Sequence, residues 1–197
     1  MTSTQEIPAI TLENCTIGYR TKKREVIIKQ DLNFEINKGT LVGVLGSNGS
    51  GKTTLLKTLT AALKPFSGHV KLQGVSLENY AAKQRATKIS YVSARQHNMG
   101  NHTVLEWVAM GRYPYTSRFG QLSKIDNEKI NDALTQTHTI QWAQKPCYTL
   151  SDGQLQRVYV ARALAQDTPI IVLDEPTTYL DLYQRVSLFK LIKELFK

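Results

Sequence analysis

The stretch TLVGVLGSNGSGKTTLLKTL, residues 40–59, decides the fold of this chain. It opens with a continuous apolar run over residues 40–46, which predicts a buried strand covered on both faces. The glycine-rich segment GSNGSGKT follows at residues 46–53, and the apolar spacing after it is that of a helix. Because a helix N-terminus presents backbone N–H groups without intrahelical partners, this strand–loop–helix order predicts a site for a phosphate anion.

The glycine-rich segment matches the pattern G-x-x-x-x-G-K-[ST] at every fixed position. Its glycines allow backbone N–H groups to surround phosphate oxygens without a Cβ clash. Lys52 is expected to reach the β- and γ-phosphates of ATP, and the Thr53 hydroxyl to bind Mg²⁺. The predicted nucleotide-binding residues here are Gly46, Ser47, Asn48, Gly49, Ser50, Gly51, Lys52, Thr53 and Thr54. A chance glycine-rich turn is the alternative, and the flanking strand and helix patterns argue against it.

A pair of acids follows a second buried-strand pattern, IIVLDE at residues 170–175. Four apolar residues bring Asp174 and Glu175 to the carboxyl end of the strand, where ligands bind in open α/β sheets. Asp174 is expected to bind Mg²⁺, and Glu175 to orient or deprotonate the attacking water as a catalytic residue. The alternative is that two acids merely end a strand before the turn EPTT, and the phosphate-binding segment favours the catalytic interpretation.

The other patterns predict an α/β fold in three parts. AITLENCTIGY and DLNFEIN alternate apolar and polar residues, as half-buried antiparallel strands do. SGHVKLQG, KISYV and PIIVLDE predict further strands, and the segments between the last two have helical spacing. The fold is therefore an antiparallel β portion, a mainly parallel core sheet, and a helical subdomain inserted at about residues 95–166. In the final amphipathic helix the predicted buried stripe is Leu182, Val186, Phe189, Ile192 and Phe196.

The segment LSDGQLQR, residues 150–157, has the pattern of a helix start. Ser151 fits the N-cap, and Gln154 stands three residues later, as in a capping box. Taken alone, the segment could be no more than this cap.

Taken in order, GSNGSGKT, LSDGQLQR and IIVLDEPTTYLD resemble the ATP-binding cassette (ABC) ATPase family, whose signature is usually LSGGQ. The resemblance covers essentially the whole chain and implies a P-loop NTPase cassette, with residues 1–197 as a single domain. It also implies a head-to-tail homodimer, in which the signature of one subunit closes over ATP held by the other. The further ATP-contacting residues that it implies are Tyr19, Ser151, Gly153, Gln154 and Asp181. Tyr19 matches the aromatic residue that stacks on adenine, with an ordinary strand aromatic as the alternative.

The sequence departs from the family pattern at two places. Asp152 replaces the first signature glycine, and its carboxylate is expected to weaken closure over ATP by like-charge repulsion unless it points away. In the family a glutamine that senses Mg²⁺ and water ends the strand corresponding to ISYV, and its place falls on Ala94 here. Gln96 stands two residues later, so either the loop is longer and Gln96 is the catalytic and Mg²⁺-binding glutamine, or Gln96 has no such role.

The segment TVLEWVAMGRYPYTSRFGQLSKIDNEKINDAL is similar to the ATPases of bacterial importers for iron–siderophore, haem and cobalamin, which share a GR-P element and then G-LS--D. The implied partners are transmembrane permease subunits and, indirectly, an external substrate-binding protein. No signal peptide or span of roughly 18 apolar residues is present, so the implied location is cytoplasmic, peripheral on the inner face of the cell membrane.

The competing class is an ABC protein that repairs nucleic acid or assists translation, which a net charge of +9 favours slightly. The Lys and Arg residues are scattered, however, and neither a coiled-coil insertion nor a second cassette is present, so no nucleic acid partner is expected.

In the family a histidine beyond the second acid contacts the γ-phosphate. The histidines of this sequence, His69, His97, His102 and His138, all precede Asp174. We therefore expect a C-terminally truncated cassette that binds nucleotide and hydrolyses it poorly.

Overall fold

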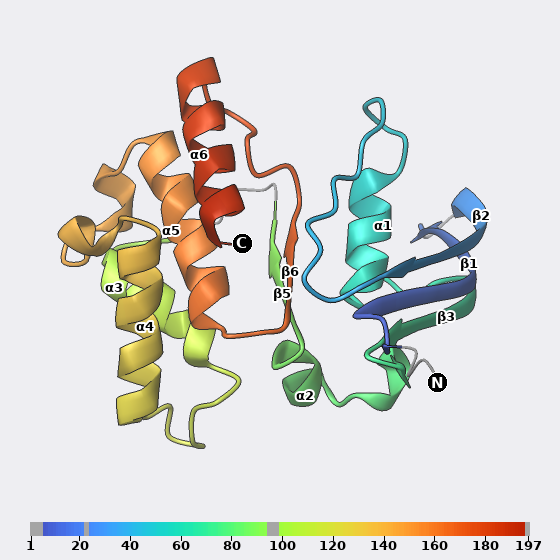
Figure 1. Cartoon of the computed structure of the whole chain (residues 1–197), viewed down its shortest axis with the longest axis horizontal. Coiled ribbons are helices and arrows are strands. Elements are labelled where there is room, and N and C mark those ends of the chain that lie inside the picture. The colour runs from blue at the N-terminus through green and yellow to red at the C-terminus, as the bar shows by residue number, and fades with distance from the viewer. Residues whose placement is uncertain (1–5, 22–23, 94–98, 196–197) are drawn as a thin grey trace, which may run out of the picture. The chain divides into compact units, whose positions relative to one another are not determined.

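The computed structural model describes residues 6–21, 24–93 and 99–195 (Figure 1). The chain divides into two compact units, Met1–Arg85 and Ala86–Lys197. Within the described residues, no helix has the length and apolar character needed to cross a membrane.

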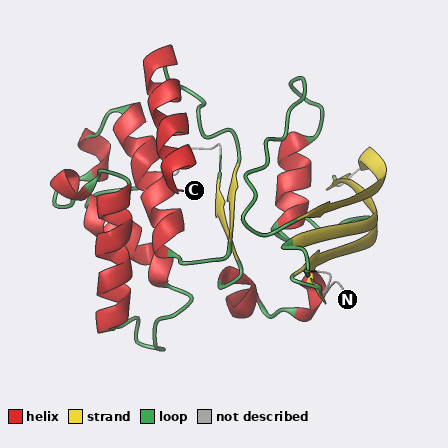
Figure 2. Ribbon diagram, viewed as in Figure 1, coloured by secondary structure: helices red, strands yellow, loops and turns green. Residues whose placement is uncertain are grey.

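The first unit is built on an antiparallel sheet in the order β2-β1-β3-β4 (Figure 2). Its strands are β1 (Ile10–Arg20), β2 (Glu25–Ile36), β3 (Ser67–Leu72) and β4 (Val75–Ser76). Leu12 lies opposite Phe34 on one side and Val70 on the other, and the side chains of Leu12, Ile17 and Leu72 are almost fully buried. The predicted antiparallel strands are confirmed.

Helix α1 (Lys52–Leu59) contacts β1 within the same unit. It begins where the glycine-rich segment ends, as predicted. A 3₁₀ turn (Leu77–Asn79) and the short helix α2 (Ala82–Ala86) follow the sheet.

The predicted buried strand at residues 40–46 is wrong. The segment is irregular, and its apolar side chains are exposed, Leu41 by 64% and Leu45 by 94%. A run of apolar residues forms a strand only where a neighbouring strand receives its backbone hydrogen bonds. The sheet of the first unit ends at β2 and β4, and among the described residues of that unit no strand pairs with this segment.

The second unit has a parallel pair of strands and four α-helices. Its elements are β5 (Ile89–Val92), α3 (Val104–Ala109), α4 (Lys124–Gln136), α5 (Asp152–Ala165), β6 (Ile170–Leu173) and α6 (Leu182–Leu195), with 3₁₀ turns at Met110–Arg112, Ile140–Trp142 and Cys147–Thr149. Helix α5 contacts α3, α4 and α6, which surround it (Figure 1). Apolar side chains of these helices, among them Val104, Val108, Leu134 and Val158, form a buried hydrophobic core. The predicted α/β combination of antiparallel and parallel strands with helices is confirmed.

The predicted stripe of the last helix is confirmed at Ile192, which is buried, and is wrong at three other positions. Leu182, Val186 and Phe189 are exposed, by 79%, 47% and 56%. The buried face of α6 instead carries Leu188, Leu191 and Ile192, which pack with Val160 of α5. The helix has apolar residues on two faces, and the face that meets α5 is the buried one. Phe196 lies outside the described residues.

Candidate functional site

The glycine-rich segment forms a turn that leads directly into α1. Gly49 and Gly51 have φ angles of 78° and 97°, a left-handed conformation that glycine adopts without steric cost. Gly51 also caps the N-terminus of α1, and a Cβ at this position would collide with the Ile28 side chain of β2. Both glycines are therefore required by the shape of the turn, and the first backbone N–H groups of α1 follow immediately.

The ammonium group of Lys52 folds back over this turn. Its Nζ donates hydrogen bonds to the carbonyl oxygens of Gly46 and Ser47, at 2.9 and 3.0 Å. A Cβ on Gly46 would press on the Ser50 hydroxyl, so the turn is closely wound at that end too. A cation, a helix N-terminus and a glycine backbone are thus gathered within eight residues, a combination that suits phosphate oxygens.

Tyr19 lies near the end of β1, in the same unit as the turn, and its side chain is 43% exposed. The preceding Gly18 allows β1, β2 and the Phe66 ring to approach closely, because a Cβ there would overlap Val26 and Phe66. An exposed aromatic ring at this place is available for stacking. The adenine-stacking role of Tyr19 stays a prediction.

Asp174 follows β6 directly and is only 1% exposed. Its backbone N–H donates to the carbonyl of Val92 at 2.9 Å, and its Oδ2 accepts a hydrogen bond from the Tyr91 hydroxyl at 2.7 Å. Burial, together with the neighbouring Asp174 carboxylate, raises the pKa of Tyr91 well above its ordinary value. Tyr91 therefore remains a protonated donor to the carboxylate at neutral pH.

Glu175 is exposed, unlike its neighbour, and has a φ angle of 48°. A non-glycine residue rarely adopts this left-handed conformation, which occurs at functional sites and tight turns. The Thr178 hydroxyl donates to Glu175 Oε2 at 3.3 Å, and the Thr178 N–H donates to the Glu175 carbonyl at 3.1 Å. The turn thus directs the two acids to different surroundings, one buried and one open to water.

The signature segment begins α5 as predicted. Ser151 is the N-cap, its Oγ accepts from the Gln154 N–H at 3.4 Å, and Gln154 Oε1 accepts from the Ser151 N–H at 3.0 Å. The capping box is confirmed. Ser151 and Asp152 are exposed, so the start of this helix faces solvent.

Asp181 lies close to the signature, which the sequence did not reveal. Asp181 Oδ1 accepts from the Gln184 N–H at 2.8 Å, and Gln184 Oε1 accepts from the Asp181 N–H at 3.3 Å. The same Gln184 side chain covers Gly153, where a Cβ would come within 3.1 Å of its Cδ. The start of α6 and the start of α5 are thus joined through one glutamine.

The phosphate-binding turn lies in the first unit, and Asp174, Glu175 and the signature lie in the second. Ala94 and Gln96 lie outside the described residues. Among the residues that are described, no three His, Cys, Asp or Glu side chains form a metal-binding group. Thr53 in the first unit and Asp174 in the second each offer oxygen atoms, the kind of ligand that Mg²⁺ prefers.

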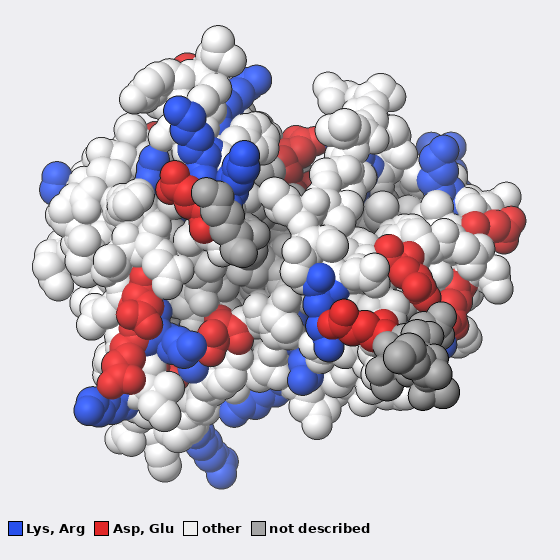
Figure 3. Space-filling view, viewed as in Figure 1, with Lys and Arg blue, Asp and Glu red and all other residues white. Residues whose placement is uncertain are grey.

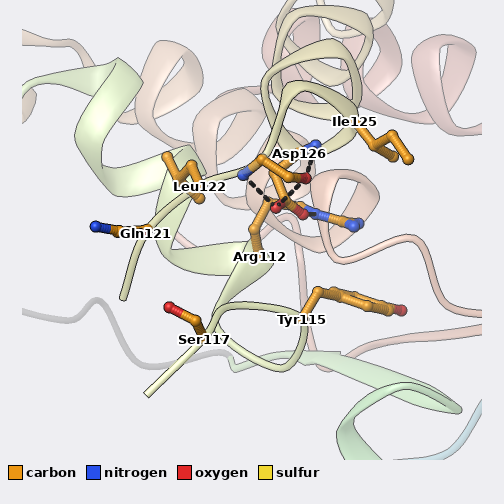
Figure 4. A pocket seen from close by; sticks show the side chains of 8 residues that line it. Arg112, Tyr115, Ser117, Gln121, Leu122, Ile125 and Asp126 are labelled. Atoms are coloured by element: carbon orange, nitrogen blue, oxygen red, sulfur yellow. Dashed lines mark hydrogen bonds and ion pairs between the residues drawn. The ribbon is translucent and has the colours of Figure 1, made fainter. Parts of the chain in front are cut away.

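The second unit also contains a hollow of about 480 Å³, lined by residues of the GR-P and G-LS--D elements (Figure 4). The buried Arg112 donates through Nε to Asp126 Oδ1 at 2.8 Å and through Nη1 to the Ala165 carbonyl at 2.8 Å. The Ser123 hydroxyl donates to Asp126 Oδ2 at 2.6 Å, and the Tyr115 ring lies 3.9 Å from the guanidinium carbon. The elements that resemble importer ATPases are therefore joined by a buried ion pair between the 3₁₀ turn after α3 and the start of α4, and Arg112 also bonds to the end of α5.

Comparison with known proteins decides the family. The ABC transporter family model matches residues 29–178, which span the phosphate-binding turn, the signature and the acid pair. The chain belongs to the ABC transporter family. The family prediction made from the sequence is thereby confirmed.

The chain is also similar to individual members of the family. The chain is 38% identical over 192 residues to the ferric enterobactin transport ATP-binding protein FepC of Escherichia coli (strain K12), covering 98% of this chain and 69% of FepC. A solved ABC transporter assigned to the metal-chelate type, in an inward-facing conformation, is 31% identical with a TM-score of 0.79, covering 96% of this chain and 69% of that chain. A dimeric ATP-binding cassette in a post-hydrolysis state with ADP and Pi is 29% identical with a TM-score of 0.80, covering 95% of this chain and 83% of that one.

Proposed function

We propose that this chain is the ATP-binding and ATP-hydrolysing subunit of a bacterial ABC importer for iron chelates, such as siderophores or haem, or for cobalamin. The observation that carries the proposal is the order of three local structures: the glycine turn under Lys52, the capped signature at Ser151, and the strand-end acids at Asp174. The similarity to FepC and to a transporter of the metal-chelate type supports import rather than another ABC function. The Arg112–Asp126 pair provides a structural basis for the importer-like sequence elements.

For the nucleotide, the proposal assigns phosphate binding to residues 46–54 and adenine stacking to Tyr19. Thr53 and Asp174 are the proposed Mg²⁺ ligands, and Gln96 is a further candidate. When bound, Mg²⁺ neutralises charge on the β- and γ-phosphates as the bond between them breaks.

For hydrolysis, Glu175 accepts the proton of the water that attacks the γ-phosphorus, for which its exposed carboxylate is suited. Lys52 stabilises the charge on the transferred phosphoryl oxygens once its bonds to the loop carbonyls are exchanged for phosphate. Ser151, Gly153 and Gln154 face the ATP of the partner subunit, and Asp181 contacts that subunit.

The proposed assembly is a head-to-tail homodimer bound to transmembrane permease subunits, and through them to an external substrate-binding protein. Residues 95–166 form the proposed helical subdomain, and the proposed location is cytoplasmic, at the inner face of the membrane. Nucleic acid is not a proposed partner. Lys and Arg are interspersed with Asp and Glu on the face seen in Figure 3, which fits a mixed surface rather than a continuous basic track.

The proposal is tested first at Lys52. Lys52→Ala removes the cation from the phosphate-binding turn, and a charge-assisted hydrogen bond contributes about 1.5–3 kcal/mol, so MgATP affinity should fall about 10- to 100-fold in a calorimetric titration. Lys57→Ala, on the same helix, is the matched control and should bind MgATP as the wild type does. Unchanged affinity in Lys52→Ala would refute the assignment, and tight DNA binding with a steep salt dependence would favour the nucleic-acid class instead.

A further inference from the structure

The hydrogen bond between Tyr91 and Asp174 joins two strands of the second unit at their carboxyl ends. Tyr91 lies opposite Val172 in the parallel β5–β6 pair, and Val92 lies opposite Leu173. Asp174 stands two residues beyond Val172 and therefore projects to the same side of the pair. Tyr91 can thus reach diagonally along that side, and its hydroxyl lies 2.7 Å from Asp174 Oδ2.

Asp174 is held by β5 at two points. Its backbone N–H extends the strand ladder to the Val92 carbonyl, and its carboxylate receives the Tyr91 hydroxyl from the preceding residue of the same strand. Because the carboxylate is almost completely buried, it adopts the orientation that its hydrogen-bond donors define. A carboxylate has about four lone-pair positions, so it can accept several partners at once.

We propose that Tyr91 is a positioning residue for the metal-binding carboxylate, and that its hydroxyl holds Asp174 in the orientation that receives the divalent cation of MgATP. This inference rests on the proposed function, because it takes Asp174 as a Mg²⁺ ligand. Tyr91 itself does not touch the nucleotide. It acts as hydrogen-bond partners of metal ligands generally act, by fixing the ligand before the metal arrives.

The chemistry of the bond supports this role. The 2.7 Å distance between the Tyr91 hydroxyl and Asp174 Oδ2 is that of a well-formed hydrogen bond from a hydroxyl donor. Phenylalanine would fill nearly the same volume without the donor. Tyr91→Phe therefore removes the orienting bond and little of the packing.

The experiment measures Mg²⁺ dependence rather than turnover. The affinity of the full chain for a fluorescent ATP analogue is determined in EDTA and then at increasing Mg²⁺ concentration. In Tyr91→Phe, the Mg²⁺ concentration for half-maximal tightening should rise about tenfold, since partners of metal ligands typically contribute 10- to 100-fold to metal affinity. The affinity in EDTA should stay unchanged, because phosphate contacts of residues 46–54 do not involve Tyr91.

Tyr115→Phe is the matched control. It also removes a tyrosine hydroxyl of the second unit, but that hydroxyl donates to the carbonyl of Asp167, ahead of β6, at 3.2 Å. Both affinities should equal those of the wild type. If Tyr91→Phe lowers stability, part of the sample is unfolded. Both affinities are measured on the same sample, so their ratio still describes the folded molecules.

Asp174→Asn separates this inference from the function on which it rests. A shifted Mg²⁺ dependence in Asp174→Asn with a normal one in Tyr91→Phe overturns the positioning role alone. A normal Mg²⁺ dependence in Asp174→Asn overturns the metal assignment and the positioning role together. If the proposal holds, adding Tyr91→Phe to Asp174→Asn produces no further shift, because the two residues act through one carboxylate.

Discussion

At the scale of single residues, Asp152 is the position where this chain departs from the usual LSGGQ signature. It occupies the first turn of α5 next to the N-cap Ser151, and it is exposed. A carboxylate in a first helical turn is stabilising by about 0.3–1 kcal/mol, because the helix N-terminus carries partial positive charge. The same N-terminus is proposed to face ATP of the partner subunit, where this carboxylate would compete with phosphate. Asp152 is thus expected to stabilise helix α5 and to oppose closure of the dimer over ATP.

Replacing Asp152 should separate these two effects. Asp152→Asn keeps the size of the side chain and removes its charge, and two like charges about 4 Å apart in water repel by roughly 1 kcal/mol. Because a symmetric head-to-tail dimer contains two such contacts, the total is roughly 2 kcal/mol, and we expect ATP-dependent dimerisation to strengthen about 30-fold, measured by analytical ultracentrifugation in a Glu175→Gln background that slows hydrolysis. Asp132→Asn, an exposed change in α4, is the control. Equal dimerisation of all three chains would show that Asp152 points away from the phosphate.

Contacts between single residues were predicted correctly from the sequence where the two hydrogen-bonded residues are close in the chain. The Ser151–Gln154 capping box spans three residues, and it formed as predicted. Tyr91 and Asp174 are 83 residues apart, and no local pattern indicates that their side chains meet. The only signal was indirect: both residues belong to buried strands, and parallel pairing of those strands brings the two side chains together.

At the scale of elements, a buried ion pair joins the 3₁₀ turn after α3 to the start of α4, and its arginine also bonds to the end of α5. The side chains of Arg112 and Asp126 are only 4% and 5% exposed, and their contact is 2.8 Å long. Removing one partner of such a pair costs about 3–5 kcal/mol, because the other charge remains buried without compensation. The pair therefore holds the helices of the second unit together and has no assigned part in binding.

Asp126→Asn should lower the free energy of unfolding by about 3 kcal/mol at pH 7, measured by urea denaturation. The Ser123 hydroxyl, assisted by Arg112, lowers the pKa of Asp126 in the folded chain, although burial opposes the shift. Because the folded-state pKa lies below the unfolded value of about 3.9, this stabilisation is complete above about pH 4 and is lost as the pH falls further. Glu128→Gln, which removes an exposed pair with Lys124, should change stability by less than about 1 kcal/mol. A pH-independent difference between wild type and Asp126→Asn would contradict the assignment.

Element-scale predictions failed where the outcome depends on a distant partner. The run at residues 40–46 has the composition of a buried strand, but composition does not supply the neighbouring strand that it needs. Helix α6 offers two apolar faces, and its own periodicity cannot say which one meets α5. By contrast, α1, α3, α4 and α5 were predicted, because apolar spacing and, for α5, the Ser151–Gln154 cap are local features.

At the scale of the whole molecule, the segment proposed to bind the phosphates of ATP and the signature proposed to close over ATP lie in different units. The phosphate-binding turn belongs to the first unit, while the signature and the acid pair belong to the second. One chain that carries both parts can serve its own nucleotide or that of a second copy. The exposed start of α5 fits the second arrangement, since it presents Ser151 to solvent.

A mixed dimer distinguishes the two arrangements. If sites form between subunits, each composite site consists of the phosphate-binding turn of one chain and the signature of the other. A dimer with Lys52→Ala on one chain and Ser151→Ala on the other then keeps one intact site, because both substitutions fall in the same composite site. A dimer with both changes on one chain and none on its partner keeps no intact site, because each site then carries one fault. If each chain served its own nucleotide, the two outcomes would be reversed.

The measurement uses two affinity tags to isolate each mixed dimer, Glu175→Gln in both chains to slow hydrolysis, and a count of ATP molecules retained per dimer. Head-to-tail pairing predicts about one ATP for changes on separate chains and almost none for both changes on one chain. Ser151→Ala also removes the N-cap of α5, at about 1 kcal/mol, so a melting curve for each chain is the necessary control. Retention of ATP only when both changes lie on one chain would mean that the signature closes over its own nucleotide, and the proposed dimer would have to be abandoned.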